Sequence, residues 1–149
     1  MFILAHNIRS LHNVGSIFRS AEVFAVDKLF LTGYTGVPPQ KEIAKTALGS
    51  EDRVVWEKAE DIFSLIEKLR AEGYAIVGLE TGENVKSITE LPSDRPVALV
   101  LGNEVTGIEH DVREKLDFLT EIPMPGHKKS LNVSVAAGIA MFVLSRKKW

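Results

Sequence analysis

The 149-residue chain contains no cysteine, which excludes disulfide bonds and thiolate metal sites and fits a reducing compartment. It also lacks a long hydrophobic run. The longest, residues 135–144, falls well short of the roughly 20 residues that a membrane-spanning helix needs. The short apolar run at residues 2–5 has no basic region before it, so it does not resemble a signal peptide. We therefore expect a cytoplasmic protein without a membrane partner.

The motifs of several common enzyme classes are missing as well. Gly102 and Gly107 have the GxxxxG spacing of a phosphate-binding loop, but Ile108 stands where that loop requires lysine. There is no GxGxxG for a dinucleotide and no GxSxG elbow around Ser130. The four histidines have no metal-ligand spacing, and we expect each to be a surface or loop residue. The sequence therefore predicts neither a metal site nor a hydrolytic triad.

Charge is distributed unevenly along the chain. Residues 1–50 carry five basic and three acidic groups, residues 51–127 carry eight and seventeen, and residues 128–149 carry five and none. If the two ends meet in the fold, they form a basic face on an acidic body, which suits a polyanion such as RNA. A solvated surface with a ragged basic tail explains the same counts, so charge alone leaves both interpretations open.

Predicted strands alternate with predicted helices, which indicates a single α/β domain over residues 1–149 with a mostly parallel sheet flanked by helices. Continuous apolar runs are typical of strands buried on both faces, and shorter runs add further strands. Strands are predicted at residues 2–5, 29–31, 53–56, 74–79, 97–101 and 118–122. A first helix is predicted to begin at Asn13, which we expect to be its capping residue. Further helices are predicted at residues 41–47, 59–71 and 109–115, with a helical turn near 85–91. The last helix is predicted to begin at Ser130 or Asn132, either of which could cap it.

The stretch from residue 121 to 146 joins a rigid loop to a hydrophobic helix. Pro123 and Pro125 restrict the backbone just before the basic residues 127–129. The helix that follows is apolar on nearly every face, so we expect its own domain and a second subunit to bury it on all sides. A basic loop held in this way is expected to bind a ligand.

Ligands of parallel α/β sheets bind beyond the carboxyl ends of the strands. Three predicted loops lie there, at residues 80–82, 102–107 and 123–130. We expect these loops to converge on one pocket.

Three segments resemble the motifs of the SPOUT RNA methyltransferases, and within that superfamily the SpoU, or TrmH-like, branch of ribose 2′-O-methyltransferases. They are NVGSIFR at residues 13–19, LGNEVTGI at 101–108, and IPMPG at 122–126 followed by SLNVSVA at 130–136. The segments occur in the family's order and span nearly the whole chain, which makes the resemblance far more specific than any single glycine pattern.

The resemblance implies features that the sequence pattern does not predict. One is a C-terminal trefoil knot, although general rules of chain topology make knots very rare. Others are S-adenosylmethionine bound in the knot and a homodimer with the site near the subunit interface. Carried over by motif position, the catalytic residues are Asn13, Arg19, Glu104, Ser130 and Asn132. The residues expected to line the cofactor are Leu79, Thr81, Gly102, Asn103, Ile122, Met124 and Leu131.

Arg19 needs a role that fits its chemistry. The family is usually described with this arginine activating the 2′-hydroxyl, yet a guanidinium has a pKa above ~12 and hardly loses its proton. We therefore expect Arg19 to pair with an RNA phosphate and to stabilise negative charge that develops on the ribose oxygen. Other RNA contacts are expected from the basic ends of the chain, namely Arg9, Lys41, Lys45, Lys128 and Lys129.

The choice of RNA is predicted only by analogy. The first motif begins close to residue 1, so we expect no separate RNA-binding domain before it, and the smallest family members tend to act on tRNA rather than ribosomal RNA. Two alternatives stay open at this point: a catalytically idle RNA-binding knot protein, and a SPOUT enzyme that methylates a base.

Overall fold

A parallel sheet of seven strands forms the centre of the computed structural model, which describes residues 1–82, 85–92 and 94–147. The strand order is β3-β2-β1-β6-β4-β7-β5, and every pairing between these strands is parallel. The strands are β1 (Phe2–His6), β2 (Lys28–Thr32), β3 (Trp56–Ala59), β4 (Ala75–Leu79), β5 (Lys86–Ser87), β6 (Val97–Leu101) and β7 (Phe118–Glu121). The predicted α/β class with a mostly parallel sheet is confirmed.

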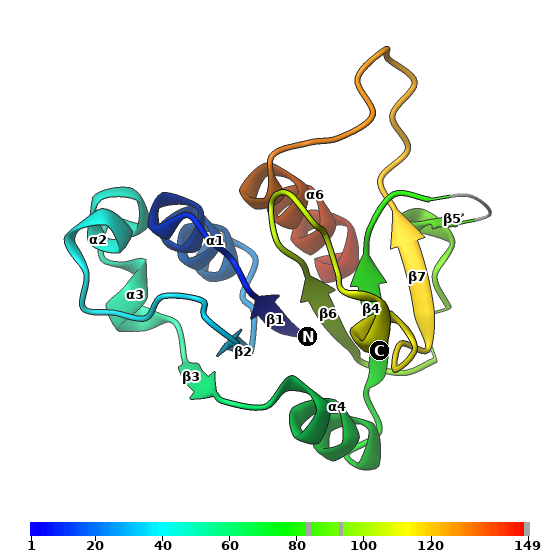
Figure 1. The fold of residues 1–149 in the computed structure, drawn as a ribbon, viewed down its shortest axis with the longest axis horizontal. Helices are drawn as coiled ribbons and strands as arrows, with labels where there is room; N and C mark the ends of the chain where they lie inside the picture. The colour runs from blue at the N-terminus through cyan, green and yellow to red at the C-terminus, as the bar shows by residue number, and fades with distance from the viewer. Residues whose placement is uncertain (83–84, 93, 148–149) are drawn as a thin grey trace.

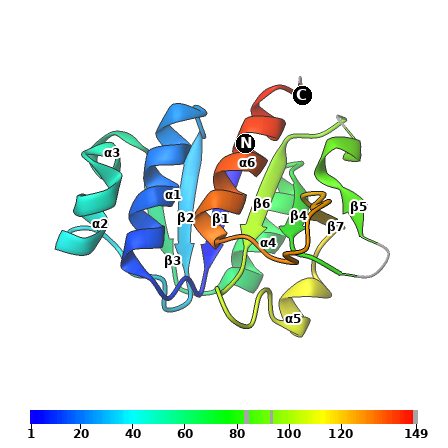
Figure 2. The same ribbon diagram turned by 90° about the horizontal axis from the view of Figure 1, so that it is seen from above.

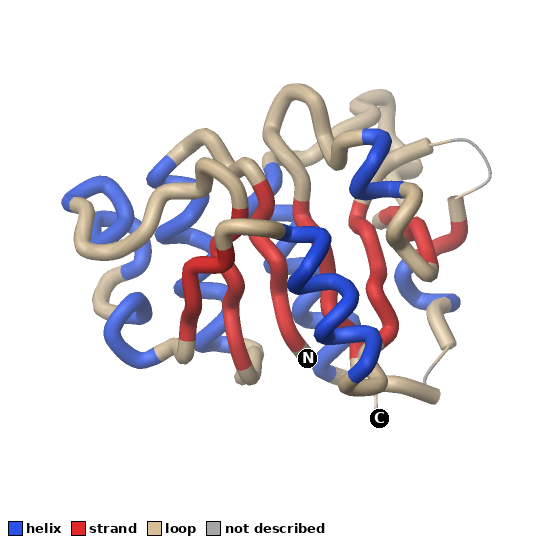
Figure 3. Tube along the Cα trace, turned by 60° about the horizontal axis from the view of Figure 1, so that its bottom comes forward, coloured by secondary structure: helices blue, strands red, loops and turns tan. Residues whose placement is uncertain are grey.

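Helices cover both faces of the sheet and give the molecule three layers (Figures 1 and 2). On one face lie α1 (Leu11–Val23) and α6 (Val133–Ser145), with α2 (Lys41–Ala47) and α3 (Ser50–Arg53) beside α1. The other face is covered by α4 (Ile62–Ala71) and, towards one end, α5 (His110–Arg113). Figure 3 shows the strands running between these two layers.

The alternation of side chains along each strand fills both sides of the sheet. In β6, Val97, Leu99 and Leu101 pack into the cluster under α1 and α6, whereas Ala98 and Val100 pack into the cluster over α4. All five are buried. This is the physical reason why the central strands are continuous apolar runs rather than alternating ones.

The start of α1 differs from the prediction. Ser10, not Asn13, caps the helix: its backbone is extended and its hydroxyl accepts a hydrogen bond from the N–H of Asn13 at 3.3 Å. Serine and asparagine are equally good caps, so the sequence pattern did not separate them. The consequence is functional, because Asn13 lies inside the first turn and its side chain is left to bond elsewhere.

The segment between residues 50 and 62 also differs. Residues 50–53 form α3, and β3 begins only at Trp56, so the strand predicted at 53–56 was wrong. The apolar pair that suggested it includes Val54, which is buried as the cap of α3. Helix α4 starts three residues later than predicted, because Asp61 caps it by accepting the N–H groups of Phe63 and Ser64. Residues 86–87 form β5, followed by a 3₁₀ turn at Ile88–Glu90.

Helix α6 begins after Asn132, one of its two predicted caps. One side of it is fully buried against the sheet, through Ala137, Ala140, Met141 and Leu144. The opposite side exposes Val135 by 50%, Ile139 by 37% and Phe142 by 48%, so within one chain the helix is not buried on every face. An apolar stripe on the outside of the molecule is therefore left uncovered beside α1.

The parallel sheet places the loops after β1, β2, β4, β6 and β7 at one edge. The trefoil knot stays a prediction. Within residues 1–82, 85–92 and 94–147, no helix combines the length and apolar character that crossing a membrane would require.

Gly15 of α1 lies directly against α2. A Cβ there would overlap the backbone oxygen of Ile43 and the hydroxyl of Thr46, both on α2. Exchanging glycine for alanine inside a helix ordinarily stabilises it by about 1 kcal/mol. We predict the reverse for Gly15→Ala, a loss of about 1–3 kcal/mol in the free energy of unfolding, because α2 must move away.

Urea unfolding at fixed protein concentration measures this effect. Gly126→Ala is the matched control: a Cβ at Gly126 has no neighbour within 4 Å among the described residues, so we expect a change of no more than about 0.5 kcal/mol. A stabilised Gly15→Ala variant would contradict the tight packing of α1 on α2.

Candidate active site

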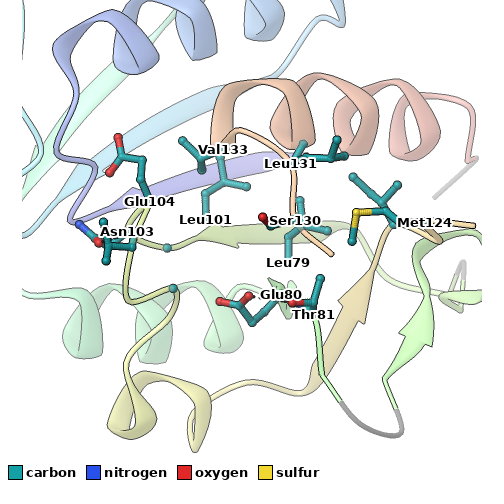
Figure 4. A pocket seen from close by; sticks show the side chains of 15 residues that line it. Leu79, Glu80, Thr81, Leu101, Asn103, Glu104, Met124, Ser130, Leu131 and Val133 are labelled. Carbon is teal, nitrogen blue, oxygen red and sulfur yellow. Dashed lines mark hydrogen bonds between the residues drawn. The ribbon is translucent and has the colours of Figure 1, made fainter. Parts of the chain in front are cut away.

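A cavity of about 320 Å³ opens at the carboxyl edge of the sheet (Figure 4). It lies where the loops after β4, β6 and β7 meet the start of α6, so the predicted convergence of three loops is confirmed. All seven residues predicted to line a cofactor are in its wall: Leu79, Thr81, Gly102, Asn103, Ile122, Met124 and Leu131. Glu104 and Ser130 of the predicted catalytic set also line it. Residues far apart in the sequence thus share one cavity, although their roles stay predictions.

The loop after β6 is rigid because it closes on itself. The backbones of Asn103 and Gly107 exchange two hydrogen bonds, at 3.0 and 2.9 Å. The Asn103 carboxamide oxygen accepts the N–H groups of Val105 and Thr106 at 2.8 and 3.0 Å. Gly107 has a positive φ of 69°, and a Cβ on Gly102 would overlap the backbone of Gly107. Both glycines are therefore required for the shape of this wall.

The Glu104 carboxylate joins this loop to the start of α1. Its oxygens accept the backbone N–H groups of Arg9 and Ser10, each at 2.9 Å, and the side-chain amide of Asn13 at 2.8 Å. Partial burial would raise the pKa of Glu104, but these hydrogen bonds outweigh burial and hold the pKa below its ordinary value. The Glu104 carboxylate thus already accepts three hydrogen bonds from the protein itself.

Asn13 extends the connection to the third motif. Its side-chain oxygen accepts a hydrogen bond from the Asn132 amide at 3.2 Å. The Asn132 oxygen in turn caps α6, accepting the N–H groups of Ser134 at 2.9 Å and Val135 at 3.3 Å. Glu104, Asn13 and Asn132 therefore form one hydrogen-bonded chain through all three sequence motifs, and we call it the three-motif chain.

Arg19 lies apart from the cavity. It follows Asn13 by six residues on α1, which places it on a different side of the helix, and it is exposed. Within the described part of the chain, no hydrogen bond or salt bridge involves its guanidinium. The structure thus brings four of the five predicted catalytic residues to one place and leaves Arg19 outside it.

The predicted RNA-binding residues are all at the surface. Arg9, Lys41, Lys45, Lys128 and Lys129 are exposed. Arg9 directly precedes the Ser10 cap and its backbone N–H donates to Glu104, which places the Arg9 backbone against the loop after β6. Lys147 differs from these residues, because its ammonium donates to the backbone oxygen of Leu91 at 2.6 Å.

Sequence reasoning missed Glu80, which lines the cavity. Its carboxylate accepts the N–H groups of Thr81 at 3.0 Å and Ile108 at 3.1 Å, and it lies 3.5 Å from the Arg113 guanidinium. Glu80 thereby ties the loop after β4 to the loop after β6. Its place at the end of a buried strand was visible in the sequence, but its partners were not.

His6 was predicted to be a surface or loop residue, and this was wrong. It ends β1 and is only 7% exposed, with Nδ1 2.8 Å from the Thr32 hydroxyl and Nε2 3.2 Å from a Glu109 oxygen. Burial lowers the pKa of His6, although the neighbouring Glu109 carboxylate partly offsets this. A neutral imidazole therefore packs behind the cavity loop.

Among the described residues, no group of three or more acidic or histidine side chains could hold a metal ion.

Comparison with known proteins places this geometry in a family. Residues 1–142 match the sequence model of the SpoU rRNA Methylase family.

The chain belongs to the SpoU methylase family.

Relatives in sequence and in structure agree with this. A Staphylococcus haemolyticus protein described as a TrmH family tRNA/rRNA methyltransferase is 32% identical over 146 residues, covering 98% of this chain and 58% of the relative. The AdoMet-bound rRNA methyltransferase from Sinorhizobium meliloti superposes with a TM-score of 0.90 at 26% identity, covering 97% of this chain and 55% of that one. The TrmH/SpoU tRNA modifying enzyme of A. aeolicus gives 0.87 at 29% identity, covering 98% and 74%.

The 149-residue chain therefore spans a little over half the length of the curated relatives it matches. The family and the SPOUT-type fold predicted from the three motifs are confirmed.

Glu104→Gln tests the three-motif chain without removing its bulk. An amide supplies one acceptor oxygen but sets an N–H₂ group against one of the backbone donors, so we predict a loss of about 1–3 kcal/mol in the free energy of unfolding near pH 7. Because the folded-state pKa of Glu104 is lowered, the carboxylate's contribution is present above its unfolded pKa and is lost as pH falls through the folded value. The difference between variant and wild type should therefore shrink towards roughly pH 3.

Urea unfolding at both pH values provides the measurement. Glu114→Gln is the matched control, an exposed carboxylate for which we expect a change within about 0.5 kcal/mol. A Glu104→Gln difference that is the same at both pH values would show that the charged form is not what the loop requires.

Proposed function

We propose that this chain is an S-adenosylmethionine-dependent RNA methyltransferase that methylates a ribose 2′-hydroxyl. The observation that carries the proposal is that the second and third family motifs line one cavity, while Asn13 of the first motif is hydrogen-bonded to Glu104 and to Asn132. Family membership supports methyl transfer, and the structural relative from Sinorhizobium meliloti is described as AdoMet bound.

The cavity suits the proposed cofactor chemically. Leu79, Ile122, Met124 and Leu131 offer apolar walls for an adenine ring, while the tight loop after β6 offers backbone polar groups for its edge. When bound, the cofactor supplies an activated methyl group. Transfer of that methyl needs neither a metal nor a covalent enzyme intermediate, only correct placement of the accepting hydroxyl.

The protein's own contribution is to orient and to stabilise charge. In this proposal the three-motif chain and Ser130 position the ribose at the mouth of the cavity. Arg19 pairs with a phosphate of the RNA and stabilises negative charge on the ribose oxygen, since an arginine hardly acts as a base. The exposed cations Arg9, Lys41, Lys45, Lys128 and Lys129 attract the remaining backbone.

The position that is methylated and the class of RNA are proposed by analogy with the family. The Asn13–Arg19 pair of the first motif favours ribose over base methylation, and tRNA is favoured over ribosomal RNA as the substrate. The presence of all five motif residues argues against an idle RNA-binding protein, because binding alone would not require the full set.

We further propose that the chain works as a homodimer through α6. The exposed side chains Val135, Ile139 and Phe142 line an apolar groove together with Ser20 of α1 and Phe24, the residue that caps the end of α1. Such a stripe is suited to burial by an identical stripe on a two-fold related copy. Ser20 directly follows Arg19, so a partner docked on this groove would approach the one predicted catalytic residue that lies outside its own cavity.

Nucleoside mass spectrometry tests the reaction. Incubation of the chain with S-adenosylmethionine and unmodified bulk tRNA or ribosomal RNA should yield 2′-O-methylated nucleosides. A base-methylated nucleoside would contradict the ribose assignment. Failure to bind S-adenosylmethionine in calorimetry would favour the idle RNA-binding alternative.

Arg19→Lys tests the role of the guanidinium in the same assay. Lysine keeps the charge but loses the planar fork, so kcat/KM should fall by on the order of 10-fold or more. Arg9→Lys is the control, because a simple phosphate contact tolerates a point charge. Near-wild-type activity of Arg19→Lys would show that the planar fork is unnecessary.

Ile139→Glu tests the dimer. A charge in the middle of the apolar stripe should convert a dimer to a monomer in sedimentation velocity, because an unpaired carboxylate is costly to bury. Lys68→Glu, which changes an exposed residue of α4 on the opposite face of the sheet, should leave the dimer intact. A wild-type chain that sediments as a monomer at tens of micromolar would contradict the proposal.

A further inference from the structure

Tyr34 presents an aromatic ring to solvent at the same sheet edge as the cavity. The residue follows β2 and is 62% exposed. Its hydroxyl accepts a hydrogen bond from the Asn103 amide at 2.8 Å. Because Asn103 also lines the cavity, one side chain separates the ring from the proposed cofactor site.

Hydrogen bonds hold Tyr34 through its hydroxyl, its backbone and the residues on either side of it. The N–H of Tyr34 donates to the Asn7 side-chain oxygen at 3.1 Å. The next residue, Thr35, is 2% exposed and bonds through its hydroxyl to the N–H of Ile8 at 2.9 Å and to the oxygen of Ala5 at 2.8 Å. The Lys58 ammonium donates to the backbone oxygens on both sides of Tyr34. The conformational entropy of this ring is thus already restricted before any ligand arrives.

We propose that Tyr34 is a stacking platform for a nucleobase of the RNA, next to the nucleotide whose ribose enters the cavity. The inference rests on the proposed function and names a binding residue that the family motifs do not contain. A fixed, exposed aromatic face matches the face of a single unpaired base. The exposed side chain of Arg9, in the loop whose N–H binds Glu104, lies at the same edge for the adjoining phosphate.

The surroundings favour a base over an apolar protein partner. A protein partner generally needs a contiguous apolar patch of several hundred Å². Tyr34 instead sits among polar side chains: Asn7 and Asn103 contact it directly, and Glu109 accepts a hydrogen bond from the Asn7 amide at 2.7 Å. A single flat ring in such a setting suits a planar ligand with polar edges, such as a base.

Asn103 also connects the platform to the cavity wall. Its amide nitrogen donates to Tyr34 and to the Asn7 backbone oxygen, while its oxygen accepts the N–H groups of Val105 and Thr106. A base stacked on Tyr34 would therefore bear on the residue that shapes the proposed cofactor loop, which places the base and the cofactor in a fixed relation.

Three substitutions separate stacking from structure. Binding of the 149-residue chain to a fluorescently labelled single-stranded RNA of mixed sequence is measured by anisotropy, beside an RNA of the same length built from abasic nucleotides. Tyr34→Ala and Tyr34→Leu should each weaken binding of the normal RNA by roughly 10-fold, since one base–aromatic stack contributes about 1–3 kcal/mol. Tyr34→Phe keeps the ring and should bind as wild type. Affinity for the abasic RNA should not differ among the variants.

Val55→Ala is the control for losing an exposed apolar side chain, since Val55 is 58% exposed and lies beside β3. Unchanged RNA affinity of Tyr34→Ala would overturn the inference. So would equal losses in Tyr34→Ala and Tyr34→Phe, which would show that the hydroxyl's bond to Asn103 is what matters, or an equal loss on abasic RNA. If the wild-type chain binds no RNA, this inference and the proposed function both fail. If it methylates RNA while Tyr34→Ala binds normally, only the platform fails.

Discussion

The arrangement of the candidate site depends on one set of hydrogen bonds. The carboxylate of Glu104 accepts two backbone N–H groups and the side-chain amide of Asn13. These bonds fix the start of α1 against the loop after β6, and Asn13 passes the connection on to the cap of α6. Three segments that lie about 90 and 30 residues apart in sequence thereby become a single rigid unit. The same hydrogen bonds lower the pKa of Glu104, because they stabilise the charged form of the carboxylate.

The parallel sheet is what allows such an interaction. With every strand running the same way, the loops after β1, β2, β4, β6 and β7 emerge at one edge, and each supplies a different part. The loops after β4, β6 and β7 form the cavity, and those after β1 and β2 supply Asn7, Arg9 and Tyr34 beside it. The apolar stripe of α6 faces away from the sheet and leaves a surface suited to a second subunit. The proposed cofactor and dimer contacts thus occupy different surfaces, with the proposed RNA contacts beside the cavity.

Periodicity and buried runs were enough to predict the α/β class, the central strands and the convergence of three loops, because each depends on local apolar pattern. The exact ends of helices and strands were harder to predict. Ser10 and Asn13 are both good helix caps, and Val54–Val55 fits either a strand or the end of a helix. Contacts between distant segments could not be read at all. Glu80 contacts Ile108 and Arg113, and His6 contacts Thr32 and Glu109. None of these partners is near its residue in sequence. The resemblance to the family motifs did predict the cavity residues, because those motifs group residues that are distant in sequence but close together in the fold.

The central claim is that the cavity at the carboxyl edge of β4, β6 and β7 binds S-adenosylmethionine. Two-dimensional ¹⁵N–¹H NMR of the labelled chain during titration with this compound tests the claim most directly. We predict saturable shifts of the backbone amides in residues 79–82, 102–107 and 122–133, with the amides of α4 and α2 unchanged. No shifts at millimolar cofactor, or shifts confined to the α4 face, would contradict it.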